Sequence, residues 1–302
     1  MNSLKFVQVI SFVLLAACSV SSYSEFTPLE HFGENPGELS ASVYSNEGVT
    51  DNLVVLLHGC SQNGEVFAEE SGLLALSKKH AFALLVPQQN KRNNIKTCFN
   101  WFSEEDTKAD SGESASIKNM IETVKAELKI QNVYVVGFSA GGAMASSLLV
   151  NYPETFVAGA VVAGVPYPCA NSLMSAFSCM KNGPSKPLGG SQGLPEKSLP
   201  RLSIWTGEKD KVVNPANARA LAQHWVQLNG LGSPETVSKA GYKVSRWPDS
   251  GQNVQLELIE IENMGHGFPI NLATQHGGVE SEYLTESPLS ASVHLIDFWG
   301  IK

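Results

Sequence analysis

The chain has 302 residues, of which 43% are hydrophobic and 17% are charged, and its formal net charge is −8. These values are typical of a compact globular protein and exclude a disordered, collagenous or coiled-coil chain. The acidic surplus, without a long run of Lys or Arg, also argues against nucleic acid as a partner. The length allows one large domain or two modest ones, with a sizeable core.

The N-terminus has the order of features that is typical of an export signal. Lys5 precedes an apolar stretch over residues 6–17, which is too short to cross a bilayer of ~30 Å as a stable helix. The run Leu15-Ala16-Ala17-Cys18 resembles the lipobox of bacterial lipoproteins, in which the cysteine is acylated and becomes the first mature residue.

We therefore expect a signal peptide over residues 1–17 and a lipid-anchored tether over 18–40, with Cys18 as the lipidation site. Ordinary cleavage and secretion is the alternative, since an apolar core that ends in small residues suits either peptidase. Ser19 beside the lipidated cysteine implies the outer membrane or periplasm of a host that has one.

Four other cysteines form an even set in a compartment that permits disulfides. They are Cys60, Cys98, Cys169 and Cys179. Four cysteines allow three pairings, and sequence alone does not choose among them. Proximity along the chain favours Cys169 with Cys179, and elimination then leaves Cys60 with Cys98; free buried thiols are the alternative.

Beyond residue 40, short apolar runs alternate with helical patterns. Such alternation predicts a single α/β domain over 41–302, with a mostly parallel sheet flanked by helices. In chain order, the expected strands are 53–57, 82–86, 133–136, 158–162, 202–205 and 256–261. The expected helices are 66–79, 113–128, 141–150, 216–228 and 289–298. The Gly- and Pro-rich segment 181–200 reads as a surface loop near the site.

The chemistry centres on Gly137-Phe138-Ser139-Ala140-Gly141, which lies between an expected strand and an expected helix. That context is the one a nucleophile elbow requires. The elbow strains the serine backbone, and the residues two positions away must lack a Cβ so that strand and helix can approach. Ser139 is thus the predicted nucleophile; a glycine-rich turn around a solvated serine is the alternative.

A serine nucleophile needs a base, and the base needs an acid; on this kind of sheet they follow in the order Ser, Asp, His. His266 lies in a loop that follows the expected strand 256–261, and Asp210 follows the strand 202–205. Both belong at the carboxyl edge of the sheet, where ligands bind. Glu208 is the alternative acid. The other downstream histidines lack that placement: His224, His276 and His294.

The predicted oxyanion hole uses the backbone N–H groups of Ala140, which follows the nucleophile, and Cys60, which lies in the loop after an early strand. His58 beside this loop is expected to be structural. No pair of His, Cys or carboxylates has the spacing of metal ligands, so we expect neither a metal nor a cofactor.

Several segments resemble the poly(3-hydroxybutyrate) depolymerase family of α/β-hydrolase esterases, over nearly all of residues 40–300. They are Leu57-His58-Gly59-Cys60-Ser61-Gln62, Cys98-Phe99-Asn100-Trp101-Phe102, Gly137-Phe138-Ser139-Ala140-Gly141-Gly142-Ala143-Met144, Ala163-Gly164-Val165-Pro166-Tyr167 and Met264-Gly265-His266-Gly267. The resemblance implies a serine esterase that cleaves polyesters or oligoesters of hydroxyalkanoates, with relatives that act on feruloyl and acetyl groups of plant polysaccharides. It also implies Ser139, Asp210 and His266 as the triad, Cys60 as an oxyanion donor and a Cys60–Cys98 disulfide.

The chain departs from that family at two aromatic positions, since Phe268 and Phe99 stand where tryptophan is common. Secreted polymer degraders of the family usually append a separate polymer-binding domain, whereas this sequence ends at Lys302. We therefore expect weak attachment to crystalline polyester.

Four aromatic residues are predicted to pack along the apolar part of the substrate, with core packing as the alternative for each. They are Trp101, Phe99, Tyr167 and Phe268. The predicted function is an exported serine esterase that hydrolyses ester bonds of 3-hydroxybutyrate polymers or oligomers through an acyl-enzyme. Alternatives are a feruloyl or acetyl carbohydrate esterase and a non-catalytic envelope binding protein. The expected partners are the ester substrate and, through the lipid anchor, a membrane; the oligomeric state stays open.

Overall fold

The computed structural model describes residues 25–46, 48, 51–185 and 199–302. The predicted signal peptide, Cys18 and most of the segment 181–200 lie outside these residues. No helix in the described ranges is both long and apolar enough to cross a membrane.

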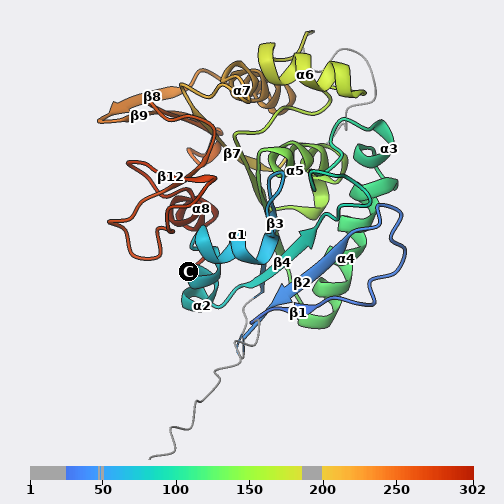
Figure 1. Ribbon diagram of the computed structural model, residues 1–302. Coiled ribbons are helices and arrows are strands. Elements are labelled where there is room, and N and C mark those ends of the chain that lie inside the picture. The colour runs from blue at the N-terminus through green and yellow to red at the C-terminus, as the bar shows by residue number, and fades with distance from the viewer. Residues whose placement is uncertain (1–24, 47, 49–50, 186–198) are drawn as a thin grey trace, which may run out of the picture.

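A ten-stranded sheet runs through the described part of the chain, in the strand order β1-β2-β4-β3-β5-β6-β7-β10-β9-β8 (Figure 1). Its strands are β1 (Thr27–Pro28), β2 (Ser40–Tyr44), β3 (Asn52–Leu57), β4 (Ala83–Gln88), β5 (Asn132–Phe138), β6 (Ala158–Val162), β7 (Arg201–Gly207), β8 (Glu235–Lys239), β9 (Tyr242–Pro248) and β10 (Val254–Ile261). The six central strands, from β4 to β10 in this order, pair in parallel, and the outer strands pair antiparallel.

All six predicted strands coincide with these six parallel strands, which confirms the mostly parallel sheet. Apolar runs mark them because helices cover both faces of a parallel sheet, so that every side chain is buried. In β3, for example, Leu53 to Leu57 are all 0% exposed.

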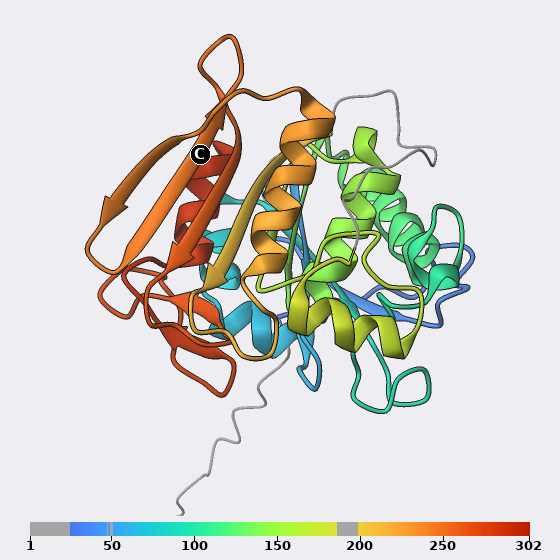
Figure 2. The same ribbon diagram turned by 90° about the horizontal axis from the view of Figure 1, so that it is seen from above.

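The helices lie on both faces of the sheet (Figures 1 and 2). They are α1 (Gly64–Glu70), α2 (Leu73–His80), α3 (Glu104–Thr107), α4 (Gly112–Leu128), α5 (Ala140–Asn151), α6 (Leu173–Asn182), α7 (Ala216–Asn229) and α8 (Ala291–Trp299), with the 3₁₀ turn η1 (Pro153–Thr155). The short strands β11 (Phe268–Ile270) and β12 (Leu284–Glu286) form a second sheet.

Two hydrophobic clusters fill the space between the layers. One joins α4, α5 and α7 to the sheet, and the other joins α1, α2 and α8 to its opposite face. The helix predicted over 113–128 contributes four buried residues to the first cluster: Ile117, Met120, Ile121 and Val124. The domain therefore has the layered architecture that its periodicity predicted.

The prediction of one helix over 66–79 is wrong, because Gly72 divides it into α1 and α2. Gly72 has φ +83°, and a Cβ built there would lie 2.1 Å from the backbone oxygen of His276. The apolar periodicity continues across this break because both short helices pack on the same cluster.

Candidate active site

Ser139 lies at a sharp turn between β5 and α5. Its backbone has φ 54° and ψ −115°, a conformation that L residues rarely adopt and that the surrounding structure must enforce. The strand and helix pack so closely that a Cβ on Gly137 would lie 2.1 Å from the oxygen of Gly141, and one on Gly141 would lie 2.1 Å from the oxygen of Leu57. Ser139 therefore stands in the elbow geometry that its sequence context predicted.

His266 and Asp210 come to Ser139 from two loops at the carboxyl edge of the sheet. His266 Nε2 lies 2.9 Å from Ser139 Oγ, and His266 Nδ1 lies 2.7 Å from Asp210 Oδ2. Two backbone bonds tie these loops together: Glu208 N–H donates to Ile261 O, and Lys209 N–H donates to Met264 O. The structure thus joins the three residues predicted as a triad in one hydrogen-bonded line.

The surroundings of Asp210 decide which nitrogen of His266 carries the proton. Asp210 Oδ1 accepts hydrogen bonds from the N–H groups of Val212 (2.8 Å) and Val213 (2.9 Å), which leaves Oδ2 to accept from His266 Nδ1. The Asp210 side chain is 0% exposed. With the proton on Nδ1, the lone pair on Nε2 faces the serine hydroxyl, as proton abstraction requires.

The other candidates for acid and base lie elsewhere. Glu208 is exposed. His294 Nε2 lies 2.8 Å from Glu257 Oε1, and His224 is buried in α7, where burial lowers its pKa.

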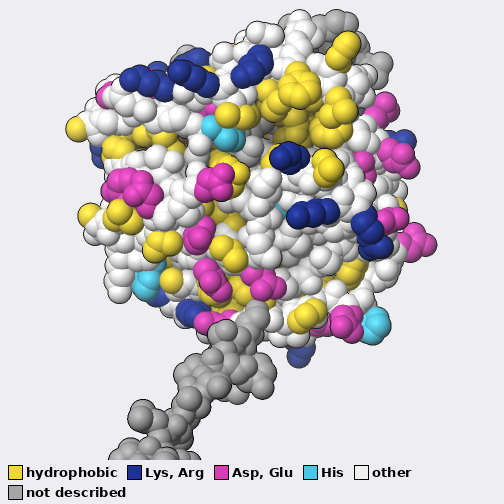
Figure 3. Space-filling view, in the orientation of Figure 1, with side chains coloured by type: hydrophobic (Ala, Val, Ile, Leu, Met, Phe, Trp, Pro, Cys, Tyr) yellow, Lys and Arg dark blue, Asp and Glu magenta, His cyan; other side chains and the backbone are white. Residues whose placement is uncertain are grey.

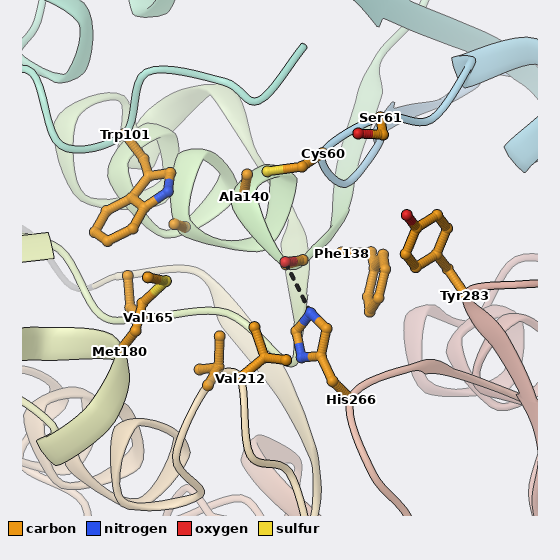
Figure 4. Close-up of a pocket in the computed structure, with 13 residues that line it drawn as sticks. Cys60, Ser61, Trp101, Phe138, Ala140, Val165, Met180, Val212, His266 and Tyr283 are labelled. Carbon is orange, nitrogen blue, oxygen red and sulfur yellow. Dashed lines mark hydrogen bonds between the residues drawn. The ribbon is translucent and has the colours of Figure 1, made fainter. Parts of the chain in front are cut away.

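A cavity of about 320 Å³ opens beside Ser139 (Figure 4). Its walls are mostly apolar, and Trp101 and Tyr283 lie at opposite ends in this view. The lining residues are Cys60, Ser61, Trp101, Phe138, Ser139, Ala140, Ala143, Val165, Met180, Val212, Val213, His266 and Tyr283.

Both predicted oxyanion donors border this cavity. Ala140 is the first residue of α5, so its N–H has no acceptor within the helix, and the positive end of the helix dipole lies there. Cys60 follows β3 and is joined by a disulfide to Cys98. Two N–H groups beside a serine can hold the oxyanion of a tetrahedral intermediate.

Of the four aromatic residues predicted to contact substrate, the structure brings Trp101 to the cavity. Phe99 and Phe268 are 0% exposed and pack beneath the site. The Phe99 ring lies 4.9 Å from that of His58, and Phe268 meets Phe67 edge to face at 5.1 Å. These two rings therefore lie in the core and are not among the residues that line the described cavity. Tyr167 is half-buried and packs against the cluster around α4, α5 and α7.

No pattern in the sequence marks most of the other cavity residues, because they come from segments far apart in the chain. Met180 belongs to α6, and Tyr283 lies just before β12. Val212 and Val213 could have been found, since they follow Asp210 by two and three positions.

The structure confirms both disulfides that chain proximity and elimination favoured. They are Cys60–Cys98 and Cys169–Cys179. Both bonds border the site, since Cys60 lines the cavity and Cys179 lies on α6 one residue before Met180. Structural disulfides indicate an oxidising compartment.

Comparisons with known proteins identify the family to which the chain belongs. The family model described as Esterase PHB depolymerase matches residues 39–245. Poly(3-hydroxyalkanoate) depolymerase C of Paucimonas lemoignei is 35% identical over 96% of this chain and 73% of its own length. Feruloyl esterase B of Thermothelomyces thermophilus is 26% identical over 86% of this chain and 93% of its own length.

Among solved structures, an acetyl xylan esterase from Aspergillus awamori superposes with a TM-score of 0.73. It is 20% identical in sequence, and the match covers 92% of this chain and 99% of that one. At such a low sequence identity, the structural likeness establishes the fold and not the substrate. Fold, family model and sequence relatives agree: the chain belongs to the Esterase PHB depolymerase family and is a carboxylic ester hydrolase of the α/β-hydrolase fold.

Proposed function

We propose that this esterase uses Ser139, His266 and Asp210 as a catalytic triad. The observation that carries the proposal is the hydrogen-bonded line from Asp210 Oδ2 through the His266 ring to Ser139 Oγ. His266 Nε2 takes the hydroxyl proton while Ser139 Oγ bonds to the ester carbonyl carbon. The N–H groups of Cys60 and Ala140 stabilise the resulting oxyanion. The protonated His266 then gives its proton to the leaving alcohol, and water releases the acyl group by the same steps.

The proposed substrates are esters of 3-hydroxyalkanoates, as polymers or oligomers. Most cavity-lining side chains are apolar, and such walls suit the methyl-bearing backbone of a hydroxybutyrate ester. A volume of about 320 Å³ is at the small end of the range for ligand sites, ~300–1,000 Å³, so a longer chain would extend outside.

The surface next to the cavity supports this choice. Three apolar side chains of α6 are exposed, at 60%, 80% and 62%: Leu173, Met174 and Phe177. Figure 3 shows hydrophobic side chains gathered in this region. No residue from Val157 to Met180 carries a charge. An uncharged apolar surface favours an aliphatic polyester over a hydroxyl-rich polysaccharide, which needs many hydrogen-bond partners.

Esters of carbohydrates are the second candidate, because the relatives include enzymes named feruloyl esterase and acetylxylan esterase. Release of 3-hydroxybutyrate from its soluble trimer separates the two. The proposal predicts release by the purified chain and none by the Ser139→Ala variant. A folded chain that leaves the trimer intact but hydrolyses feruloyl or acetyl esters would establish the second candidate instead.

We also propose that the chain is exported and lipid-anchored at Cys18. The order of charge, apolar core and Leu-Ala-Ala-Cys supports this, as do the two disulfides. In a bacterial host, a Cys18→Ala variant should move from the membrane fraction to the soluble fraction. If this variant stays in the membrane fraction, Cys18 is not a lipid anchor.

A further inference from the structure

Three buried polar side chains lie beneath the Cys60 wall of the cavity. His58 follows β3, Gln89 follows β4, and Glu113 is the second residue of α4. His58 and Glu113 are 0% exposed and Gln89 is 1% exposed. Polar groups at such depth are costly unless they are bonded, and these three form a continuous network that the triad does not use.

His58 is the member nearest to the proposed oxyanion hole. The backbone N–H of Gln89 donates to His58 Nε2 (3.2 Å), so the ring proton belongs on Nδ1, which donates to Gly59 O (2.7 Å). Burial lowers the pKa of His58 to about 4, so the ring is neutral at pH 7.

The contact with Gly59 sets the direction of the next N–H group. Gly59 C=O and Cys60 N–H belong to one planar peptide unit, in which they point in opposite directions when the bond is trans. A carbonyl held towards His58 therefore turns the Cys60 N–H away from it. Cys60 borders the cavity together with Ser139 and Ala140.

Gln89 and Glu113 extend the network to the opposite side of the disulfide. Gln89 Nε2 donates to Cys98 O (3.2 Å) and to Glu113 Oε1 (2.5 Å). Glu113 Oε2 accepts from the backbone N–H of Asn100 (2.8 Å), the residue before Trp101. One carboxylate thus holds the segment that carries both the disulfide partner of Cys60 and the aromatic wall of the cavity.

We propose that Glu113 is a positioning residue for ester hydrolysis, which acts through Gln89 and His58 on the Gly59–Cys60 peptide and through Asn100 on Trp101. This inference rests on the proposed function of Cys60 as an oxyanion donor. Glu113 touches neither the substrate nor the reacting atoms.

The ionised form of Glu113 is the one that completes the network, because its partners are all N–H donors: Gln89, Asn93 and Asn100. Burial and the nearby carboxyl of Asp106 on α3 raise the pKa of Glu113 to about 8, although the hydrogen bonds from Asn100 and Gln89 act to lower it. Protonation would place an O–H against a donor and weaken one contact.

The test compares Glu113→Gln with Glu127→Gln, the same change at an exposed position on the same helix. At pH 9, Glu113→Gln should lower kcat for a soluble ester about 10- to 100-fold with little change in KM, because a displaced oxyanion donor acts on the transition state. Binding of phenylboronic acid, whose tetrahedral adduct needs the same donor, should weaken in parallel. At pH 6, where Glu113 is protonated, the difference from wild type should shrink.

A folded Glu113→Gln variant with wild-type kcat and boronate affinity at pH 9 would overturn the inference. If wild type itself hydrolyses no ester, the proposed function fails instead, so the two failures are distinguishable.

If Glu113→Gln does not fold, a second pair of variants tests the same positioning role at His58. The amide of His58→Asn occupies the place of Nδ1 and can still donate to Gly59 O, whereas that of His58→Gln occupies the place of Nε2 and cannot. We expect His58→Asn to retain more activity than His58→Gln. Equal kcat values in the two folded variants would contradict the positioning role.

Discussion

Asp210→Asn changes one atom of the proposed triad and keeps the shape of the side chain. The asparagine oxygen can still accept from the N–H groups of Val212 and Val213, as Oδ1 does in wild type. Its NH₂ group then faces His266 Nδ1, 2.7 Å from the atom it replaces. A donor at this place requires an acceptor on the ring, so the proton of His266 moves to Nε2, towards Ser139.

That tautomer cannot accept the serine proton. The loss follows from the wrong tautomer and not from a distorted site, so we expect kcat to fall about 10⁴-fold. Such a factor corresponds to about 5 kcal/mol of lost transition-state stabilisation. The free energy of unfolding should change little by comparison, because two of the three hydrogen bonds of the side chain persist.

Steady-state hydrolysis of the hydroxybutyrate trimer measures this effect, with thermal unfolding as a check on the fold. Glu208→Gln is the matched control, since this neighbouring carboxylate is exposed and should be dispensable. If Asp210→Asn folds and keeps kcat within tenfold of wild type, or if Glu208→Gln causes the larger loss, the assigned acid is wrong.

Gly141→Ala should lower the free energy of unfolding, measured in urea, by several kcal/mol, because the added Cβ would lie 2.1 Å from the Leu57 oxygen. A variant as stable as wild type would contradict the close approach of strand and helix. The neutral His58 ring stabilises the fold fully above its ordinary pKa of 6.5, and this contribution is lost as the pH falls through about 4. Acidification from pH 7 to 4 should therefore lower the free energy of unfolding of wild type by on the order of 3 kcal/mol more than that of His58→Asn. Equal decreases in the two proteins would refute this prediction. Replacement of the exposed α6 residues Leu173, Met174 and Phe177 by serine should lower adsorption to a polyhydroxybutyrate film severalfold and leave soluble-ester hydrolysis unchanged. The same change at the remote exposed residues Val237, Leu272 and Val279 should leave adsorption intact. An equal fall in adsorption in both variants would contradict a specific adsorbing surface on α6.

The parts of the fold and site that the sequence predicts are those with a local signal. Each central strand is an apolar run because both faces of the sheet are covered. Such a run can be recognised in the sequence without knowing which strands pair with it. Ser139 is predictable as the nucleophile because its elbow imposes glycine at two nearby positions. Asp210 and His266 are predictable as its partners because each follows a predicted strand at the edge where sites form.

The missed features depend on tertiary context. The edge strand β8 reads Glu-Thr-Val-Ser-Lys and is exposed throughout, so it lacks the apolar run that marked the centre of the sheet. Phe99 and Phe268 are aromatic neighbours of site residues, and the sequence does not say whether such a ring lines the cavity or supports it from below. The network of His58, Gln89 and Glu113 joins three segments that only the folded sheet brings together.

Labelling with a fluorophosphonate is the experiment that shows whether Ser139 is the nucleophile. The reagent bonds to an activated serine oxygen with loss of fluoride, and mass spectrometry of the digested chain locates the adduct. We expect a single adduct on the peptide that contains Ser139, loss of esterase activity in proportion to labelling, and no adduct in Ser139→Ala. Activity that survives complete labelling of Ser139, or an adduct at another serine that alone abolishes activity, would contradict this expectation.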